Sequence, residues 1–334
     1  MHSRVWAVLA VAVVTVSLAG CSSPLDVSEA ERAAAATCEV LQPLPGVASA
    51  SCVVDDGGFD AGISRDTSVT LEAGVTAQEA HRVMTTWLAS KDGGFDEYEV
   101  SGSRATSLRL TLTANEDASF SLAPGTPPTG VAFVEEWLSR AQRGMPISAS
   151  AGDGRTIHVP NEGLSPAAQA NLLDEFAMQT RTDGLTLAIG DGSTVESPVS
   201  ASLSATLHAL DASYLGFVAS DPDHELELDV DVFTGSPPRL RFRIPTGMAP
   251  SIPPDRALTE TSGWPAIRTV LEAATPGEEP YTVALTAVPG QVIGGFSTSG
   301  CTPELTGPEP QFGGELQAQW AQIHGIPRPE TCPR

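Results

Sequence analysis

Lysine is almost missing from this sequence of 334 residues: Lys91 is the only one, and the remaining cations among its 18 Lys and Arg are arginines. Against 41 Asp and Glu, they leave a formal net charge of -23. A protein this poor in cations has little with which to displace the counterions of a nucleic acid, so the composition argues against nucleic-acid binding. Aromatic residues are only 5%, but the hydrophobic fraction of 41% supports a packed core and argues against disorder.

Three motifs that mark common catalytic or nucleotide-binding sites are missing. The sequence has no Gly-x-Ser-x-Gly elbow, no His-Glu-x-x-His and no Gly-x-Gly-x-x-Gly, and the nearest approach, Gly295–Ser299, lacks the final glycine. We therefore expect no catalytic residue, no cofactor and no metal ion. A pair of carboxylates that the fold brings together would escape this search, which keeps an enzyme with an unrecognised site as an alternative.

Two short repeats invite a metal-binding interpretation. Residues 56–60 and 92–96 both read Asp-Gly-Gly-Phe-Asp, and carboxylates around flexible glycines could bind Ca²⁺, which takes several hard oxygen ligands. The full acidic EF-hand loop is absent, and Asp-Gly and Gly-Gly are common in turns. We therefore interpret both repeats as turns.

Histidines and tryptophans offer the other candidate site residues. We expect His81, His158 and His224 to be ordinary surface or half-buried side chains rather than catalytic bases. The four tryptophans beyond residue 20 fall in predicted helices, where packing against a sheet is favoured over a sugar- or peptide-stacking surface; they are Trp87, Trp137, Trp264 and Trp320.

The first twenty residues have the pattern of an export signal. Arg4 precedes an apolar run at residues 5–16, which is too short for a comfortable transmembrane span, and the run leads into Leu18-Ala19-Gly20-Cys21. This ending resembles the lipobox of bacterial lipoproteins. The resemblance implies cleavage just before Cys21, diacylglyceryl transfer to its sulfur and often N-acylation; the alternative is an ordinary signal peptide with an incidental cysteine.

Electrostatics would not hold such a protein at a membrane. Loss of Arg4 leaves 17 cations against 41 acids, a charge of -24, which anionic head groups repel. Two acyl chains on Cys21 would give the stable anchoring that one chain does not. We therefore expect the protein on the extracytoplasmic face of the cell membrane, with the bilayer as one partner and an unidentified envelope protein as another.

Without Cys21, four cysteines remain, and an even number in an exported protein is typical of disulfides. Three pairings are open. We favour Cys38–Cys52 and Cys301–Cys332, because each joins neighbours in sequence at one end of the chain. Metal ligation is disfavoured, since the sequence has no Cys-x-x-Cys.

Helical and strand patterns alternate in the order helix, strand, strand, about five or six times. The clearest helix is residues 76–91, where Thr76 and Glu79 form a capping box and apolar residues recur at helical spacing. Read in another frame, the order is β-α-β-β-α-β. We therefore predict an α+β fold of tandem ferredoxin-like (split-βαβ) sandwiches with antiparallel sheets, divided into a signal peptide (1–20), an N-terminal domain (21–151) and a C-terminal domain (152–334).

Residues 225–244 predict a hairpin of defined register. Acidic residues at every second position of its first half alternate with apolar ones, and arginines do the same in the second half. If paired position numbers sum to 470, Asp231 faces Arg239 and Asp229 faces Arg241, while the apolar faces also match. We therefore expect the acidic run from Asp221 to be a solvated, cross-paired strand face rather than a cation site.

Together these features favour a non-catalytic, lipid-anchored envelope protein that binds or scaffolds another envelope component. One alternative is a lipoprotein that captures a small molecule or cation for a transporter. The other is an envelope enzyme with a site that its sequence does not reveal.

Overall fold

The computed structural model describes the chain in segments. They are residues 27–55, 63–90, 92, 99–100, 103–127, 129–152, 154–160, 164–178, 185–190, 192–196, 199–220, 228–233, 235–244, 257–261, 263–287, 291–301, 303 and 312–327.

The described helices and strands follow one another in a regular order. The helices are α1 (Val27–Leu41), α3 (Ala77–Leu88), α4 (Val131–Ala141), α5 (Pro166–Met178), α6 (Ala201–Ser220), α7 (Trp264–Ala273) and α8 (Gly313–His324), with a 3-10 turn at Leu258–Glu260. The strands are β1 (Val47–Asp55), β2 (Ile63–Leu71), β3 (Glu99–Val100), β4 (Ser103–Leu112), β5 (Asn115–Leu122), β6 (Ser148–Ala151), β7 (Arg155–Val159), β8 (Leu185–Ile189), β9 (Ser193–Val195), β10 (Leu228–Val232), β11 (Arg239–Ile244), β12 (Thr282–Ala287) and β13 (Gln291–Ser297). The predicted alternation of one helix with two strands is therefore confirmed.

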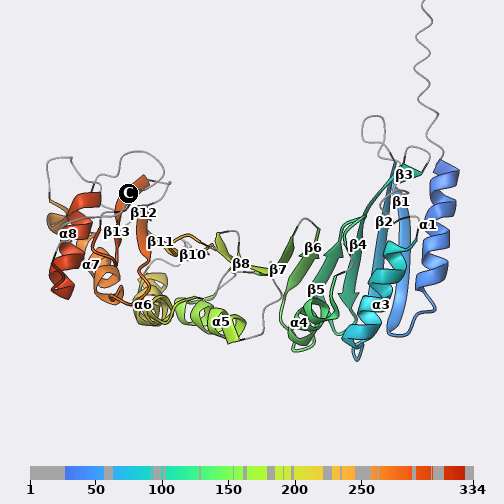
Figure 1. The fold of residues 1–334 in the computed structure, drawn as a ribbon, viewed down its shortest axis with the longest axis horizontal. Helices are drawn as coiled ribbons and strands as arrows, with labels where there is room; N and C mark the ends of the chain where they lie inside the picture. The colour runs from blue at the N-terminus through green and yellow to red at the C-terminus, as the bar shows by residue number, and fades with distance from the viewer. Residues whose placement is uncertain are drawn as a thin grey trace, which may run out of the picture.

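All these strands belong to a single thirteen-stranded sheet in the order β1-β2-β4-β5-β6-β7-β8-β9-β10-β11-β12-β13, with β3 paired to β4 beside this path. The two strands of each hairpin are antiparallel, whereas each of α3 to α7 connects two parallel strands that are direct neighbours, as β2 and β4 are. Figure 1 shows the elongated body that results, with the helices in a row along the sheet.

The ratio of one helix to two strands follows from the width of a strand pair, which matches the distance between packed helices. Neighbouring strands lie about 4.8 Å apart, so a pair occupies about 10 Å, close to the 8–10 Å between the axes of packed helices. Each helix thus covers the strand pair beside it, and every unit shares its apolar face with the next.

The buried core lies on the helix-covered face of the sheet. On β2, Val69 and Leu71 are fully buried, while the alternate residues Ser68 and Thr70 are exposed or half-buried. The same alternation continues on β4, β5, β7 and β8. The larger aromatic rings fill the centre of this layer: Phe120 of β5 meets the ring of Trp137 of α4 edge to face, with 5.4 Å between centroids.

Two features of the predicted fold need correction. The sheet is mixed, not antiparallel, because the crossover helices make every second pairing parallel. Tandem ferredoxin-like sandwiches are not confirmed: a split βαβ places another strand between the two strands that its helix connects, whereas here those strands are neighbours. The α+β mixture and the repeated unit stand, but they form one continuous layer of strands.

The predicted domain boundary coincides with the β6–β7 turn. The strand ladder crosses it, with Ala151 paired to Arg155, and so does the helix layer, where the guanidinium of Arg140 lies over the ring of Phe176 at 5.7 Å. The division into two domains stays a prediction.

Helix boundaries show where local sequence signals were sufficient. The capping box of α3 is present, with the Thr76 hydroxyl accepting from the Glu79 amide and the Glu79 carboxylate accepting from the Thr76 amide. Helix α6 was not predicted from the sequence. The described part of α6 has few charged side chains, so it lacks the charged outer face that identifies a helix such as α3.

Candidate functional site

The predicted disulfide Cys38–Cys52 is present and joins α1 to β1. Cys301 is also disulfide-bonded. Cys332 and Cys21 lie outside the described residues, so the Cys301–Cys332 pairing and the lipidation of Cys21 stay predictions.

The face of the sheet opposite the helices is the principal candidate for function. We call it the open face and define it by the strand residues that alternate with the buried core between β1 and β9. Along this face, cross-strand partners are mostly serine and threonine. One row runs through Ser51, Ser68, Arg109, Ser121, Ser150, Thr156 and Thr186. A second runs through Thr70, Thr111, Ser119, Ser148, His158, Ala188 and Thr194.

Hydroxyl groups are the commonest side-chain groups in these rows, with Arg109, His158 and Ala188 as the exceptions. Each hydroxyl can donate one hydrogen bond and accept others, and carries no charge. Neighbouring strands place successive hydroxyls about 4.8 Å apart, close enough for one extended ligand to contact several at once. Within the second row, the hydroxyl of Thr111 donates to that of Thr70 at 3.4 Å.

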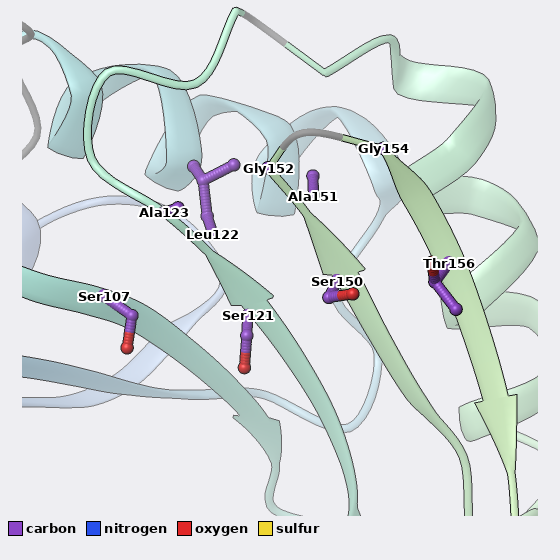
Figure 2. A pocket seen from close by; sticks show the side chains of 9 residues that line it. All are labelled: Ser107, Ser121, Leu122, Ala123, Ser150, Ala151, Gly152, Gly154 and Thr156. Atoms are coloured by element: carbon purple, nitrogen blue, oxygen red, sulfur yellow. The ribbon is translucent and has the colours of Figure 1, made fainter. Parts of the chain in front are cut away.

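A shallow pocket of about 310 Å³ lies where the first row meets the ends of β5 and β6. Figure 2 shows Ser121 and Ser150 pointing to the same side of the sheet, while Leu122 and Ala151 point to the other. The lining residues come from four adjacent strands and the turn between β6 and β7; they are Ser107, Ser121, Leu122, Ala123, Ser150, Ala151, Gly152, Gly154 and Thr156. The surface offered here is therefore mixed: four of the lining residues carry hydroxyls, while Leu122, Ala123 and Ala151 contribute apolar groups.

The charged hairpin has the predicted register. Asp229 is the Cα partner of Arg241, and Asp231 is the partner of Arg239. The pairs involving residues 225–227 lie outside the described residues. The ion pairs are less regular than the register, because Arg241 binds both carboxylates, at 3.0 Å to Asp229 and 3.3 Å to Asp231.

This part of the sheet is also less solvated than predicted. Asp229 is only 8% exposed, and burial raises the pKa of its carboxyl, partly offset by the positive charge of Arg241. The pKa of Asp231 is also raised, again chiefly by burial. Gly192 makes the close packing feasible, because a Cβ there would lie 1.9 Å from a carboxylate oxygen of Asp229. The pair is therefore structural, as predicted, but embedded in the molecule.

The Asp-Gly-Gly repeats do not form a described metal centre. Asp92 is fully buried, and its carboxylate accepts a hydrogen bond from Nε of Arg65 at 2.6 Å. Residues 56–60 and 93–96 lie outside the described residues, so the interpretation of both repeats as turns stays a prediction. Within the described part of the chain, no group of three or more His, Cys, Asp or Glu side chains could hold a metal ion.

Two of the described histidines contact backbone carbonyl oxygens through Nε2, and a third, His208, has its Nε2 3.9 Å from the Asp174 carboxylate. His158 lies on the open face as the cross-strand partner of Ser148, but its Nε2 is 3.1 Å from the carbonyl oxygen of Gly190. His324 makes a similar contact with the carbonyl of Leu271, and half-buried His81 lies on α3. His224 lies outside the described residues.

Three of the predicted core tryptophans, Trp87, Trp137 and Trp320, are fully buried, and Trp264 packs against the core while partly exposed. Trp320 also donates from Nε1 to the carbonyl of Ala274 at 2.7 Å. The predicted packing role is therefore confirmed, and none of the three buried rings offers a stacking surface.

A second pocket, of about 900 Å³, lies at one rim of the sheet where three connections meet. Its walls are the residues before and at the start of α6, the β10–β11 turn with the exposed ring of Phe233, and the loop that carries Glu278 and Glu279. Sequence reasoning could not find it, because it joins segments that lie about 80 residues apart.

No protein-family model, curated protein or solved structure matches this chain. Among the described residues, none of the helices has the length and apolar character needed to cross a bilayer.

Proposed function

We propose that this protein is a non-catalytic lipoprotein, anchored through Cys21 on the extracytoplasmic face of the cell membrane, that binds or scaffolds another envelope component on its open face. The observation that carries this proposal is a sheet whose helices cover one face while uncharged hydroxyls line most of the other over many strands.

A long array that consists mostly of hydroxyl groups favours extended contact over catalysis. A catalytic site concentrates a few different groups at one point, with a nucleophile or base held near its partner. Here Ser148 and His158 are partners in the ladder, yet the histidine Nε2 contacts the Gly190 carbonyl. The described residues thus offer many equivalent hydrogen-bonding groups spread along the molecule, as a scaffold requires.

Export supports the same proposal. The disulfide between α1 and β1 suits an oxidising compartment. The lipobox-like segment ends at Cys21, six positions before α1 begins, so a fully extended connection would place α1 within about 20 Å of the lipid. The body would then sit close to the bilayer despite its negative charge.

Photo-crosslinking in intact cells tests the binding role. A benzoyl-phenylalanine at Ser150, exposed on the open face, is expected to capture one defined envelope protein. The control position is Glu135, which is also exposed but lies on the outer surface of α4. Identical products from both positions, or a hydrolytic or transfer activity in the purified mature protein, would contradict the proposal.

Replacement of the anchoring thiol tests the location. The Cys21→Ser variant is expected to leave the membrane fraction and to appear unlipidated by mass spectrometry. A variant that stays membrane-bound would refute anchoring through this cysteine.

The pocket beside Phe233 favours capture of a small molecule or cation as the second candidate function. An exposed aromatic ring next to two glutamates is a combination that organic cations can use. A thermal-shift panel of metals and solutes tests this candidate. A ligand that binds in this pocket should raise the melting temperature of the unmodified protein but not that of Phe233→Ala. If no ligand behaves in this way, the result counts against the candidate.

A further inference from the structure

The two edge strands of the sheet, β1 and β13, differ in how many of their outward-facing backbone groups are hydrogen-bonded. At the far edge, the side-chain amide of Gln317 on α8 accepts from the Ser297 amide at 2.8 Å and donates to the Ser297 carbonyl at 3.1 Å. The backbone amide of Phe312 donates a hydrogen bond to the carbonyl oxygen of Ile293 at 3.0 Å. Side-chain and backbone groups thus take the place of a further strand beside β13.

The opposite edge, on β1, has a single such contact among the described residues. The amide of Ala50 donates to Oε1 of Gln42 at 2.9 Å, so the backbone of Ala50 faces away from β2. Backbone groups alternate in direction along an antiparallel pair, so those of Cys52 and Val54 also face outward. No described residue bonds to these outward groups.

Exposed apolar surface accompanies these outward-facing backbone groups. Val53 is 55% exposed on the open face, the most exposed of the large apolar side chains described. Val27 is 38% exposed and lies three helical turns before Cys38, on the side of α1 that is tied to β1. An edge strand with both features is a template for pairing with another chain.

We propose that this edge is a self-association surface, on which β1 of a second copy adds antiparallel to β1 of the first. With the two-fold axis at Val53, Cys52 of each copy faces Val54 of the other, and the outward-facing amides and carbonyls of these residues pair. Val53 then meets its own counterpart as a pair without hydrogen bonds, the type in which side chains lie closest. This single register therefore pairs the outward-facing backbone groups and also covers the side chain of Val53.

The position of the membrane anchor explains why the occupant is a second copy. This part of the proposal rests on the proposed anchoring. Cys21 lies six positions before α1, and α1 lies beside β1 at one end of the body, with β13 and α8 at the other (Figure 1). Two anchored copies in one bilayer would therefore share the region in which these edges meet. Confinement to a surface raises their effective concentration, as a tether does.

The two-fold arrangement also continues the architecture. An axis perpendicular to the sheet leaves the helices of both copies on the same face, and α1 of one copy lies beside α1 of the other. The spacing of one helix to two strands is thus preserved across the interface. Because each copy is strongly negative, association is expected to strengthen as salt screens the repulsion.

The test uses the purified mature chain, both lipidated in vesicles of neutral phospholipid and as the soluble Cys21→Ser variant. Benzoyl-phenylalanine at Val53 is expected to give a dimer whose crosslinked peptides both come from β1. Val53→Asp places two carboxylates opposite each other and should reduce the dimer at least tenfold. Val40→Asp is the matched control, because Val40 is 46% exposed on α1 and does not belong to the edge strand.

The outcomes separate this inference from the proposed function. A crosslinked β1–β1 dimer that Val53→Asp abolishes and Val40→Asp leaves intact would support the edge. A monomer by light scattering at high salt with no self-crosslink in vesicles, or equal loss in both variants while circular dichroism shows intact folding, would overturn it. Membrane release of Cys21→Ser is measured separately, so anchoring can stand when self-association fails.

Discussion

Removal of the Cys38–Cys52 disulfide is expected to loosen α1 selectively. The two cysteines are 14 positions apart, and cross-linking a loop of about 15 residues contributes about 3 kcal/mol by restricting the unfolded chain. The disulfide reinforces a helix that buries little apolar surface. The buried side chains of α1 are mainly small, with three alanines, Thr37 and Leu41. At about 0.8 kcal/mol per buried methyl and about 2 for leucine, their burial contributes about 4–5 kcal/mol.

The disulfide is therefore comparable with all the apolar packing of this terminal helix. In a linear array each unit is held by its neighbours, and α1 has α3 on one side only, so its loss need not unfold the rest. We expect the double variant Cys38→Ser/Cys52→Ser to increase hydrogen exchange of the α1 amides about 100-fold, since 1.4 kcal/mol corresponds to a factor of ten.

Mass-spectrometric hydrogen exchange under native conditions is the assay. Exchange in β6 and α4 should stay close to that of the unmodified protein. Cys301→Ser removes the disulfide near the other end and is the matched control, because it should leave α1 unchanged. Less than threefold faster exchange in α1, or equal acceleration throughout the chain, would refute the reasoning.

Two further changes test packing and burial. Gly192→Ala is expected to lower the free energy of unfolding in urea by about 1–3 kcal/mol, because the added Cβ would clash with the Asp229 carboxylate. Gly154→Ala is the control, since a Cβ there has nothing within 4 Å, and it should lower that free energy by less than about 1 kcal/mol. Similar losses for both variants would contradict this reasoning. Tyr281 has its pKa raised by burial to about 12 from 10.0, so its phenol contributes stability that is present below pH 10 and lost as pH rises toward 12. About 1 kcal/mol should disappear by pH 11, and Tyr281→Phe should remove that part of the pH dependence.

Local patterns were reliable where one side of an element differs sharply from the other. The capping box and apolar stripe of α3 and the charge alternation of the 239–244 strand follow from chain periodicity within a short span. The Cys38–Cys52 pairing was favoured instead because the two cysteines are close in sequence. The missed helix α6 shows the converse, because weak contrast between its sides gave no periodic signal.

The candidate surface was beyond sequence reasoning for a different reason. Ser121, Ser150 and Thr156 are ordinary residues at alternate strand positions, and nothing in their spacing distinguishes them from any solvated strand face. These three residues lie side by side on the open face because the strands pair in this register and the crossover helices cover only the other face. Likewise, Gln317 closes an edge of the sheet from 20 positions beyond Ser297.

By itself, the sequence determined the repeating unit of one helix and two strands, the hairpin register at Asp229 and Arg241, and the first disulfide, because each depends on neighbours within a few turns of chain. Tertiary structure alone decided that the units join edge to edge into one mixed sheet instead of separate sandwiches. The same alternation of elements satisfies either arrangement locally. The choice depends on which strand fills the edge beside each crossover, and that is a contact between distant segments.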